Sequence, residues 1–193
     1  MNSDDSQTMI NVSGHAGVDD LQAQFKMPWW DIAEGETDYQ LQLRLPYGDN
    51  KPDLTVQSTL AGIVLDLPDT LAKSAGQERP LSLRFELTDE ALLPIQLNYD
   101  NKLKAAISLN AKQQRIHSGH VLVGAGEATL PREAGLELEI NRDRLDLPEW
   151  LSLSAAAAQG QENDAGATSD IREIKIHSDR GVWKKTELGV FDL

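Results

Sequence analysis

The most regular feature of this sequence is an alternation of apolar and polar residues in several short runs. In residues 81–87, leucine and phenylalanine alternate with serine, arginine and glutamate, and the same pattern recurs elsewhere. The other runs are 39–45, 95–99, 103–109 and 136–140. Successive side chains of a strand point to opposite faces, so each run predicts a β-strand with one apolar and one polar face.

Less regular apolar segments predict further strands at 54–65, 116–123, 174–176 and 182–188. Turn-forming residues separate the runs, and the clearest turn is Asp100–Asn101, because both residue types tolerate a positive φ. Short links of this kind join antiparallel neighbours, whereas parallel neighbours need longer crossovers. The sequence therefore predicts a mainly β fold: a twisted antiparallel sheet, groove-like or partly closed into a sandwich.

Few residues remain for helices, and one or two short ones are expected. The best candidate runs from Asp146 to Ala158, where Asp146 and Glu149 have the spacing of a capping box and Pro148 lies in the first turn. A weaker candidate covers Val18–Phe25, and a single turn is possible after Pro68.

We expect four segments along the chain. Residues 1–28 form a partly ordered N-terminal segment, and residues 29–158 form the β domain with its C-terminal short helix. Residues 159–169 lack large apolar side chains and are expected to be a flexible linker. Residues 170–193 are too few to build a core of their own, so they are expected to pair with the sheet as an incomplete β segment.

Composition excludes several classes of protein. The chain has 193 residues, with 18 Lys and Arg against 31 Asp and Glu, and a net charge of −13. This acidity argues against nucleic-acid binding, which needs a surplus of cations. The chain has no cysteine, which removes disulfides, thiolate metal sites and cysteine nucleophiles. Residues 1–7 do not resemble an export signal, and no apolar run is long enough for a membrane span.

We expect no catalytic residue, no metal site and no cofactor. His117 and His120 form an H-x-x-H pair, but their odd separation on a strand directs the two rings to opposite faces. The stretch 141–146 lacks the glycine of a calcium loop, and 124–126 lacks the third glycine of a dinucleotide site. A hydrolase would need clustered carboxylates around a histidine in a deep pocket, and the sequence gives no such set.

Four tryptophans leave a binding module as an alternative. Trp29, Trp30, Trp150 and Trp183 could stack on carbohydrate, but adjacent residues of a strand face opposite ways, so Trp29 and Trp30 cannot share one platform. Packing at sheet edges is the simpler interpretation. Exposed, coplanar tryptophans would favour a β-sandwich module for carbohydrate or a protein partner.

Two stretches of the sequence are more specific than these general patterns. The first contains S-T-L-A-G at 58–62 and L-P-D-T-L-A-K at 67–73. The second contains G-A-G-E-A-T-L-P at 124–131, then G-L at 135–136 and L-D-L-P-E-W at 145–150. In this order they resemble the YhdP family of Gram-negative envelope proteins, relatives of AsmA and TamB. Thr70 stands where that family usually has proline, and Pro148 falls inside the last motif.

The resemblance implies a periplasmic fragment of a protein anchored to the inner membrane by a segment absent from this chain. It also implies long bent sheets that shelter phospholipid acyl chains, support for the outer-membrane barrier, and no known catalytic residues. The expected partners are these acyl chains and flanking parts of a longer chain. No transmembrane segment is expected in residues 1–193.

The apolar face of the predicted sheet is the candidate site. Its lipid-facing candidates are Leu83, Phe85, Leu97, Ile107, Leu109, Leu136, Leu138 and Ile140. Core packing is the simpler interpretation of any one of them, and lipid contact is expected for a subset. The net charge of −13 disfavours anionic headgroups close to the surface, so we expect headgroups to project into solvent without an arginine or lysine clamp.

Overall fold

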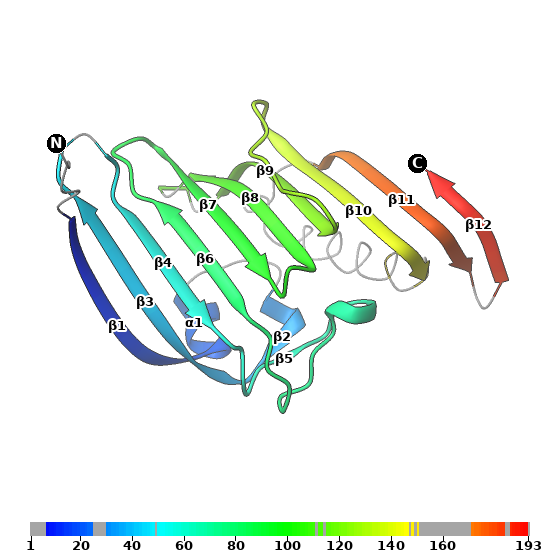
Figure 1. Cartoon of the computed structure of the whole chain (residues 1–193), viewed down its shortest axis with the longest axis horizontal. Helices are drawn as coiled ribbons and strands as arrows, with labels where there is room; N and C mark the ends of the chain where they lie inside the picture. The colour runs from blue at the N-terminus through cyan, green and yellow to red at the C-terminus, as the bar shows by residue number, and fades with distance from the viewer. Residues whose placement is uncertain are drawn as a thin grey trace, which may run out of the picture.

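Ten strands of the computed structural model form one large sheet that does not close on itself (Figure 1). The structure describes residues 7–24, 30–48, 50–110, 112–113, 115–146, 148, 150, 171–183 and 186–192. In spatial order the strands are β1 (Gln7–Gly17), β3 (Glu36–Pro46), β4 (Asp53–Ser58), β6 (Leu81–Glu86), β7 (Leu92–Tyr99), β8 (Leu103–Asn110), β9 (Arg115–Gly124), β10 (Gly135–Asp146), β11 (Ile171–Trp183) and β12 (Thr186–Asp192). The prediction of a mainly β fold is confirmed, and the sheet is open.

The sheet is mainly antiparallel, as predicted, but it is mixed rather than antiparallel throughout. β9, β10 and β11 run parallel to one another, and the other neighbours are antiparallel. Residues 125–134 carry the chain from the end of β9 back to the start of β10 without a helix. Polar side chains of the sheet hold this crossover: Lys104 donates to the Gly126 carbonyl at 2.6 Å, and Thr129 N–H donates to His120 Nδ1 at 3.2 Å. A crossover this short was not anticipated from the usual βαβ length.

The turn predicted at Asp100–Asn101 joins β7 to β8. Both residues have positive φ, 52° and 51°, and Lys102 N–H donates to the Tyr99 carbonyl at 2.9 Å. This is the geometry of a type I′ hairpin turn, whose twist matches that of the flanking strands. The predicted hairpin is confirmed.

Short elements at one end of the sheet form what we call the cap. It comprises α1 (Val18–Gln24), η1 (Trp30–Ile32), the two-stranded sheet of β2 (Ala33–Glu34) and β5 (Val64–Leu65), and the segment 59–80 with η2 (Asp69–Leu71). Figure 1 shows these elements together near the end of β4 and the start of β6. Val18, Leu60, Ile63 and Leu71 of the cap are buried, and they form the core together with side chains of the sheet.

Several boundaries differ from the sequence-based expectation. The strand predicted over 54–65 ends at Ser58, because Leu60 and Gly62 adopt positive φ and turn the chain into the cap. The strand predicted over 182–188 spans the end of β11 and the start of β12. β1 was not predicted as a strand, whereas the weaker helix candidate is confirmed as α1.

The predicted C-terminal helix is described only at its start. β10 continues to Asp146, and Pro148 and Trp150 are helical. The rest of the helix predicted to Ala158, and the linker predicted at 159–169, lie outside the described residues.

Candidate functional site

The strand register aligns apolar side chains into rows that cross the sheet. The central row takes one residue from each of nine adjacent strands: Val12, Leu41, Val56, Leu83, Leu97, Ala105, Val121, Leu138 and Ile174. Adjacent strands lie about 4.8 Å apart, so this row extends for about 38 Å along the sheet. Every member is apolar, and the row is therefore continuous.

Two further rows flank the central row on the same face. The outer row is Ile10, Leu43, Leu54, Phe85, Ile95, Ile107, Gly119, Leu136 and Ile171. The capped row, on the side of the cap, is Leu81, Tyr99, Leu103, Val123, Ile140 and Ile176. Rows two residues apart along a strand are about 7 Å apart, so the three rows form one broad apolar surface.

All eight candidate residues lie on this face. Leu83, Leu97 and Leu138 belong to the central row, and Phe85, Ile107 and Leu136 belong to the outer row. Leu109 lies beyond the outer row, opposite Leu93 and Ile116, while Ile140 belongs to the capped row.

Exposure divides the face into two parts. In the capped row, Tyr99, Val123 and Ile140 are 4%, 1% and 2% exposed and belong to the core. The seven other candidates are half-buried, and the edge residues Ile10 and Ile171 are 44% and 56% exposed. We call the central and outer rows the open rows. Ile140 therefore lies in the core under the cap, whereas the other seven candidates keep accessible apolar surface.

Polar contacts hold the cap over the capped row. The Tyr99 hydroxyl donates to the Leu71 carbonyl at 3.0 Å, and Arg142 Nη2 donates to Thr70 Oγ1 at 2.6 Å. Arg79 Nη1 also donates to the Tyr99 hydroxyl at 3.4 Å, and within the cap it donates to the Thr70 carbonyl. Burial raises the pKa of the Tyr99 hydroxyl, which keeps it a protonated donor.

Lys73 is buried within the cap. It is 3% exposed, and its Nζ donates to the Ile63 carbonyl at 2.6 Å and to the Ser74 carbonyl at 3.1 Å. Burial is the main cause that lowers the pKa of Lys73, because its ammonium loses hydration. The two carbonyls compensate part of that loss, so the side chain fixes the conformation of the cap.

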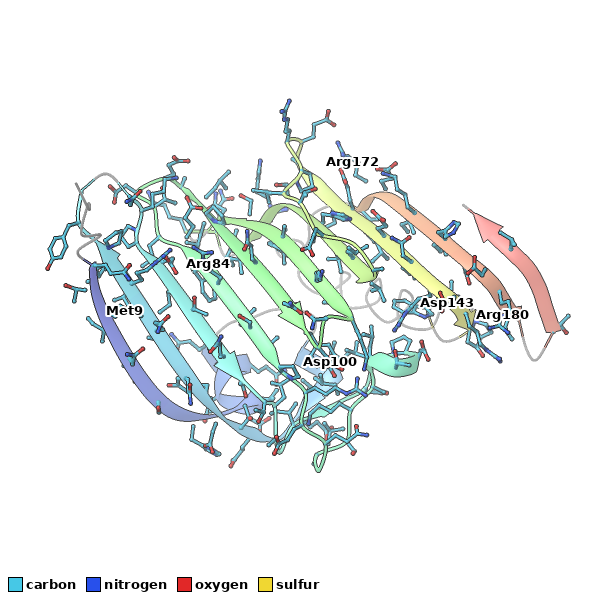
Figure 2. The ribbon with its side chains drawn as sticks, viewed as in Figure 1. Met9, Arg84, Asp100, Asp143, Arg172 and Arg180 are labelled. Carbon is cyan, nitrogen blue, oxygen red and sulfur yellow. The ribbon has the colours of Figure 1, made fainter. Side chains whose placement is uncertain are left out.

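The opposite face of the sheet is polar. A representative row across it is Gln40, Gln57, Ser82, Asn98, Lys104, Leu122, Glu139 and Lys175. Leu122 is apolar there, and it is 1% exposed because the crossover 125–134 lies over that part of the face. Buried Asp53 lies within 3.5 Å of Arg84 Nε (labelled in Figure 2) and also pairs with Arg44.

The two histidines of the H-x-x-H pair do not form a common site. His117 is exposed where the β8–β9 register shifts, whereas His120 is buried on the polar face with Nε2 3.4 Å from Glu139 Oε2. Within the described part of the chain, no group of three or more His, Cys, Asp or Glu side chains could hold a metal ion.

Among the described side chains, the tryptophans form no flat surface on which carbohydrate could stack. Trp150 is half-buried and packs against the core cluster. Trp29 and the side chains of Trp30 and Trp183 lie outside what the structure describes.

The candidate list omitted residues that complete the open rows. Ile10 and Val12 of β1 extend both rows to the sheet edge, and their spacing of two was the available signal. Gly119 interrupts the outer row, but a Cβ there would lie 2.9 Å from Leu136 Cδ2, so the neighbouring leucine covers the position. The rows are therefore continuous from β1 to β11.

One of three comparisons with known proteins gave a match. A family model described as YhdP protein matches residues 1–183 of the chain. No curated protein and no solved structure matches it.

Proposed function

This chain belongs to the YhdP family, and from that premise we propose that its open rows shelter the acyl chains of phospholipids. Family membership identifies an AsmA-like protein of the cell envelope. In our proposal the protein supports phospholipid transport between the inner and outer membranes, and with it the integrity of the outer-membrane barrier.

The observation that carries the proposal is a continuous apolar surface on a folded sheet, in which every open-row residue except Ala105 and Gly119 is half-buried or exposed. Soluble proteins normally bury such a surface, and extended exposed patches mark binding sites. Burial of each CH₂ is worth about 0.8 kcal/mol, so a sixteen-carbon chain fully sheltered from water gains roughly 13 kcal/mol. A chain lying on the open rows is sheltered on one side by protein and gains part of that amount.

Continuity of the rows supports movement rather than fixed storage. Each of the nine strands contributes one residue to each open row, and all of these residues except Gly119 carry an apolar side chain, so a bound chain meets a similar environment at nearly every step of about 4.8 Å. Similar environments give the bound acyl chain a similar free energy at each position. Movement along the rows therefore has no large free-energy barrier from a tightly bound position. Since no bond is made or broken, we propose a non-enzymatic role.

The location is part of the same proposal. No helix within the described ranges has the length and apolar character needed to cross a bilayer. We propose that this segment lies in the periplasm and that a part of the protein outside these 193 residues anchors it to the inner membrane.

Native mass spectrometry of the purified chain tests the proposal through co-purified phospholipid. Leu138→Asp places a charge in the central row, while Gln96→Asp places the same charge on the exposed polar face. We expect lipid adducts on the wild type and on Gln96→Asp, and their loss on Leu138→Asp, because an ionised carboxylate disfavours an apolar guest.

Two results would contradict the proposal. Adducts that persist on Leu138→Asp would place the lipid elsewhere. A chain free of lipid in all three forms, even after incubation with phospholipid, would favour a structural segment or a protein-binding module.

A further inference from the structure

The net charge of −13 is distributed unevenly around the apolar face. The two ends of the strands border the open rows, and the charge at the capped end differs in sign from the charge at the opposite end of β8–β11. If acyl chains lie on the rows, as proposed above, this difference decides where an anionic headgroup is stable.

The capped end is strongly acidic. In the described ranges 18–24, 30–38, 59–80 and 100–102 there are ten carboxylates and three Lys or Arg. Six of the carboxylates fall within 18–38, where the described residues include no Lys or Arg, and all six are exposed: Asp19, Asp20, Asp31, Glu34, Glu36 and Asp38. An anionic headgroup is repelled from this end.

The opposite end of β8, β9, β10 and β11 is basic. We call the described residues 112–113, 115, 131–134 and 171–172 the basic rim; it contains Lys112, Arg115, Arg132 and Arg172 against Glu133 alone. Arg172 is paired with Glu133 and Glu137. Lys112, Arg115 and Arg132 are exposed, and no ion pair links them to other described residues. Figure 2 shows Arg172 at the upper end of the sheet and Asp100 at the opposite end.

The basic rim directly adjoins the apolar face. Arg115 is followed by Ile116, which is paired with Leu109, and the outer-row residue Gly119 lies three positions further along the same strand. Three strand residues span about 10 Å. Long Lys and Arg side chains place their charged groups at a boundary between apolar surface and water.

From this arrangement we propose that the basic rim binds the phosphate of an anionic phospholipid headgroup while its acyl chains lie on the open rows. The proposal rests on the function proposed above and adds an orientation: heads lie at the basic rim and away from the cap. The rim is exposed, so the contacts are electrostatic and solvated rather than those of a closed clamp.

The chain provides a matched control. Arg144 and Arg180 are exposed at the far ends of β10 and β11, where described acidic and basic residues are equal in number: Asp143, Asp146 and Asp179 against Arg142, Arg144 and Arg180. Figure 2 labels Asp143 and Arg180 there. The double variants Arg115→Glu/Arg132→Glu and Arg144→Glu/Arg180→Glu change the net charge equally and differ in the end of the sheet that they alter.

The test is a titration of the three forms of the chain with short-chain phosphatidylglycerol, phosphatidylcholine and inorganic phosphate at low salt. We expect Arg115→Glu/Arg132→Glu to bind phosphatidylglycerol roughly tenfold more weakly than the wild type, since two attractive contacts become repulsive. We expect the affinity of Arg115→Glu/Arg132→Glu for phosphatidylcholine to change by less than about twofold. We expect Arg144→Glu/Arg180→Glu to bind both lipids like the wild type. Inorganic phosphate alone should bind far more weakly than the lipid. High salt should remove the difference between the two double variants.

A second measurement uses the wild-type chain alone. A spin label on the headgroup of bound phosphatidylglycerol should broaden the amide signal of Gln113 at the basic rim and leave that of Asp100 sharp. Equal loss of affinity in both double variants, or broadening at Asp100 instead, would overturn the orientation while lipid binding itself stands. Failure of the wild type to bind either lipid would overturn the proposed function as well.

Discussion

The capped row and the open rows are built from the same strands and the same alternation of residues, yet fully buried large side chains (Tyr99, Val123 and Ile140) occur in the capped row and not in the open rows. Val121 and Val123 lie two residues apart in β9 on one face, and Val123 is 1% exposed while Val121 is half-buried. The difference comes from the cap, because Val123 belongs to the same buried core cluster as Ile63 and Leu71 of the cap. Burial along a strand is thus set by distant segments, and a surface that no described segment covers remains available for a guest.

The largest expected effect is on the free energy of unfolding, and it distinguishes the cap from the open rows. Leu71→Ala removes a side chain that is 1% exposed in the cap, and we expect a loss of about 2–5 kcal/mol in the free energy of unfolding. Leu83→Ala in the central row should cost about half as much or less, because its side chain is already partly hydrated in the folded state. Equilibrium unfolding in urea measures both. Equal losses would contradict the division of the face into capped and open parts.

A smaller effect concerns the pH dependence of the cap. Burial lowers the pKa of Lys73, so near pH 9–10 the unfolded chain binds more protons at this residue than the folded chain does. Stability contributed through Lys73 therefore rises with pH up to its ordinary pKa of 10.5. Lys73→Met should reduce this rise.

The difference in unfolding free energy between the wild type and Lys73→Met, followed from pH 8 to 10, isolates that contribution. Parallel pH profiles would show that the ammonium is hydrated in the folded chain. The range ends at pH 10 because the raised pKa of Tyr99 acts in the opposite direction above it.

The smallest effect lies on the edge strand β1, on its polar face. Hydrogen bonds to Asp38 and then Glu36 raise the pKa of His15 above 6.5. The stabilisation that protonated His15 gives to the β1–β3 pairing is therefore fully present below pH 6.5. It is lost as the pH rises through the folded-state pKa of His15. Amide protection factors of β1 should fall slightly between pH 6 and 8, and His15→Gln should remove this trend. A trend that survives the substitution would assign it to another group.

The sequence was sufficient to predict which face of a strand each residue occupies. It was insufficient to predict the relative direction of all neighbouring strands. Leu83, Leu97 and Leu138 share one row because alternation alone fixes the face of a strand residue. The Asp100–Asn101 turn was predictable because its two residue types suit a positive φ. The parallel order of β9, β10 and β11 depends on a crossover held by tertiary contacts from Lys104 and His120, which have no local signature.

Within the cap, α1 and the turn after Pro68 were predicted, whereas the path of segment 59–80 and the strand β1 were missed, for related reasons. Segment 59–80 has no periodic pattern, and its conformation depends on the burial of Lys73 and on positive φ at Leu60 and Asp69. The alternation of Thr8, Ile10 and Val12 is short, and β1 is defined as a strand only by its pairing with β3. Ile140 could be placed on the apolar face from sequence, but its burial could not, because cap residues of its core cluster such as Leu71 are distant in the chain.

Site-specific photocrosslinking tests the central claim most directly. A photoreactive phenylalanine analogue at Leu97 would lie in the central row, and the same analogue at Gln96 would lie on the polar face one residue away. After irradiation in the presence of phospholipid, we predict covalent lipid adducts at position 97 and not at position 96. Adducts at both positions in equal amount, or at position 96 alone, would contradict the assignment of the open rows as the lipid-binding surface.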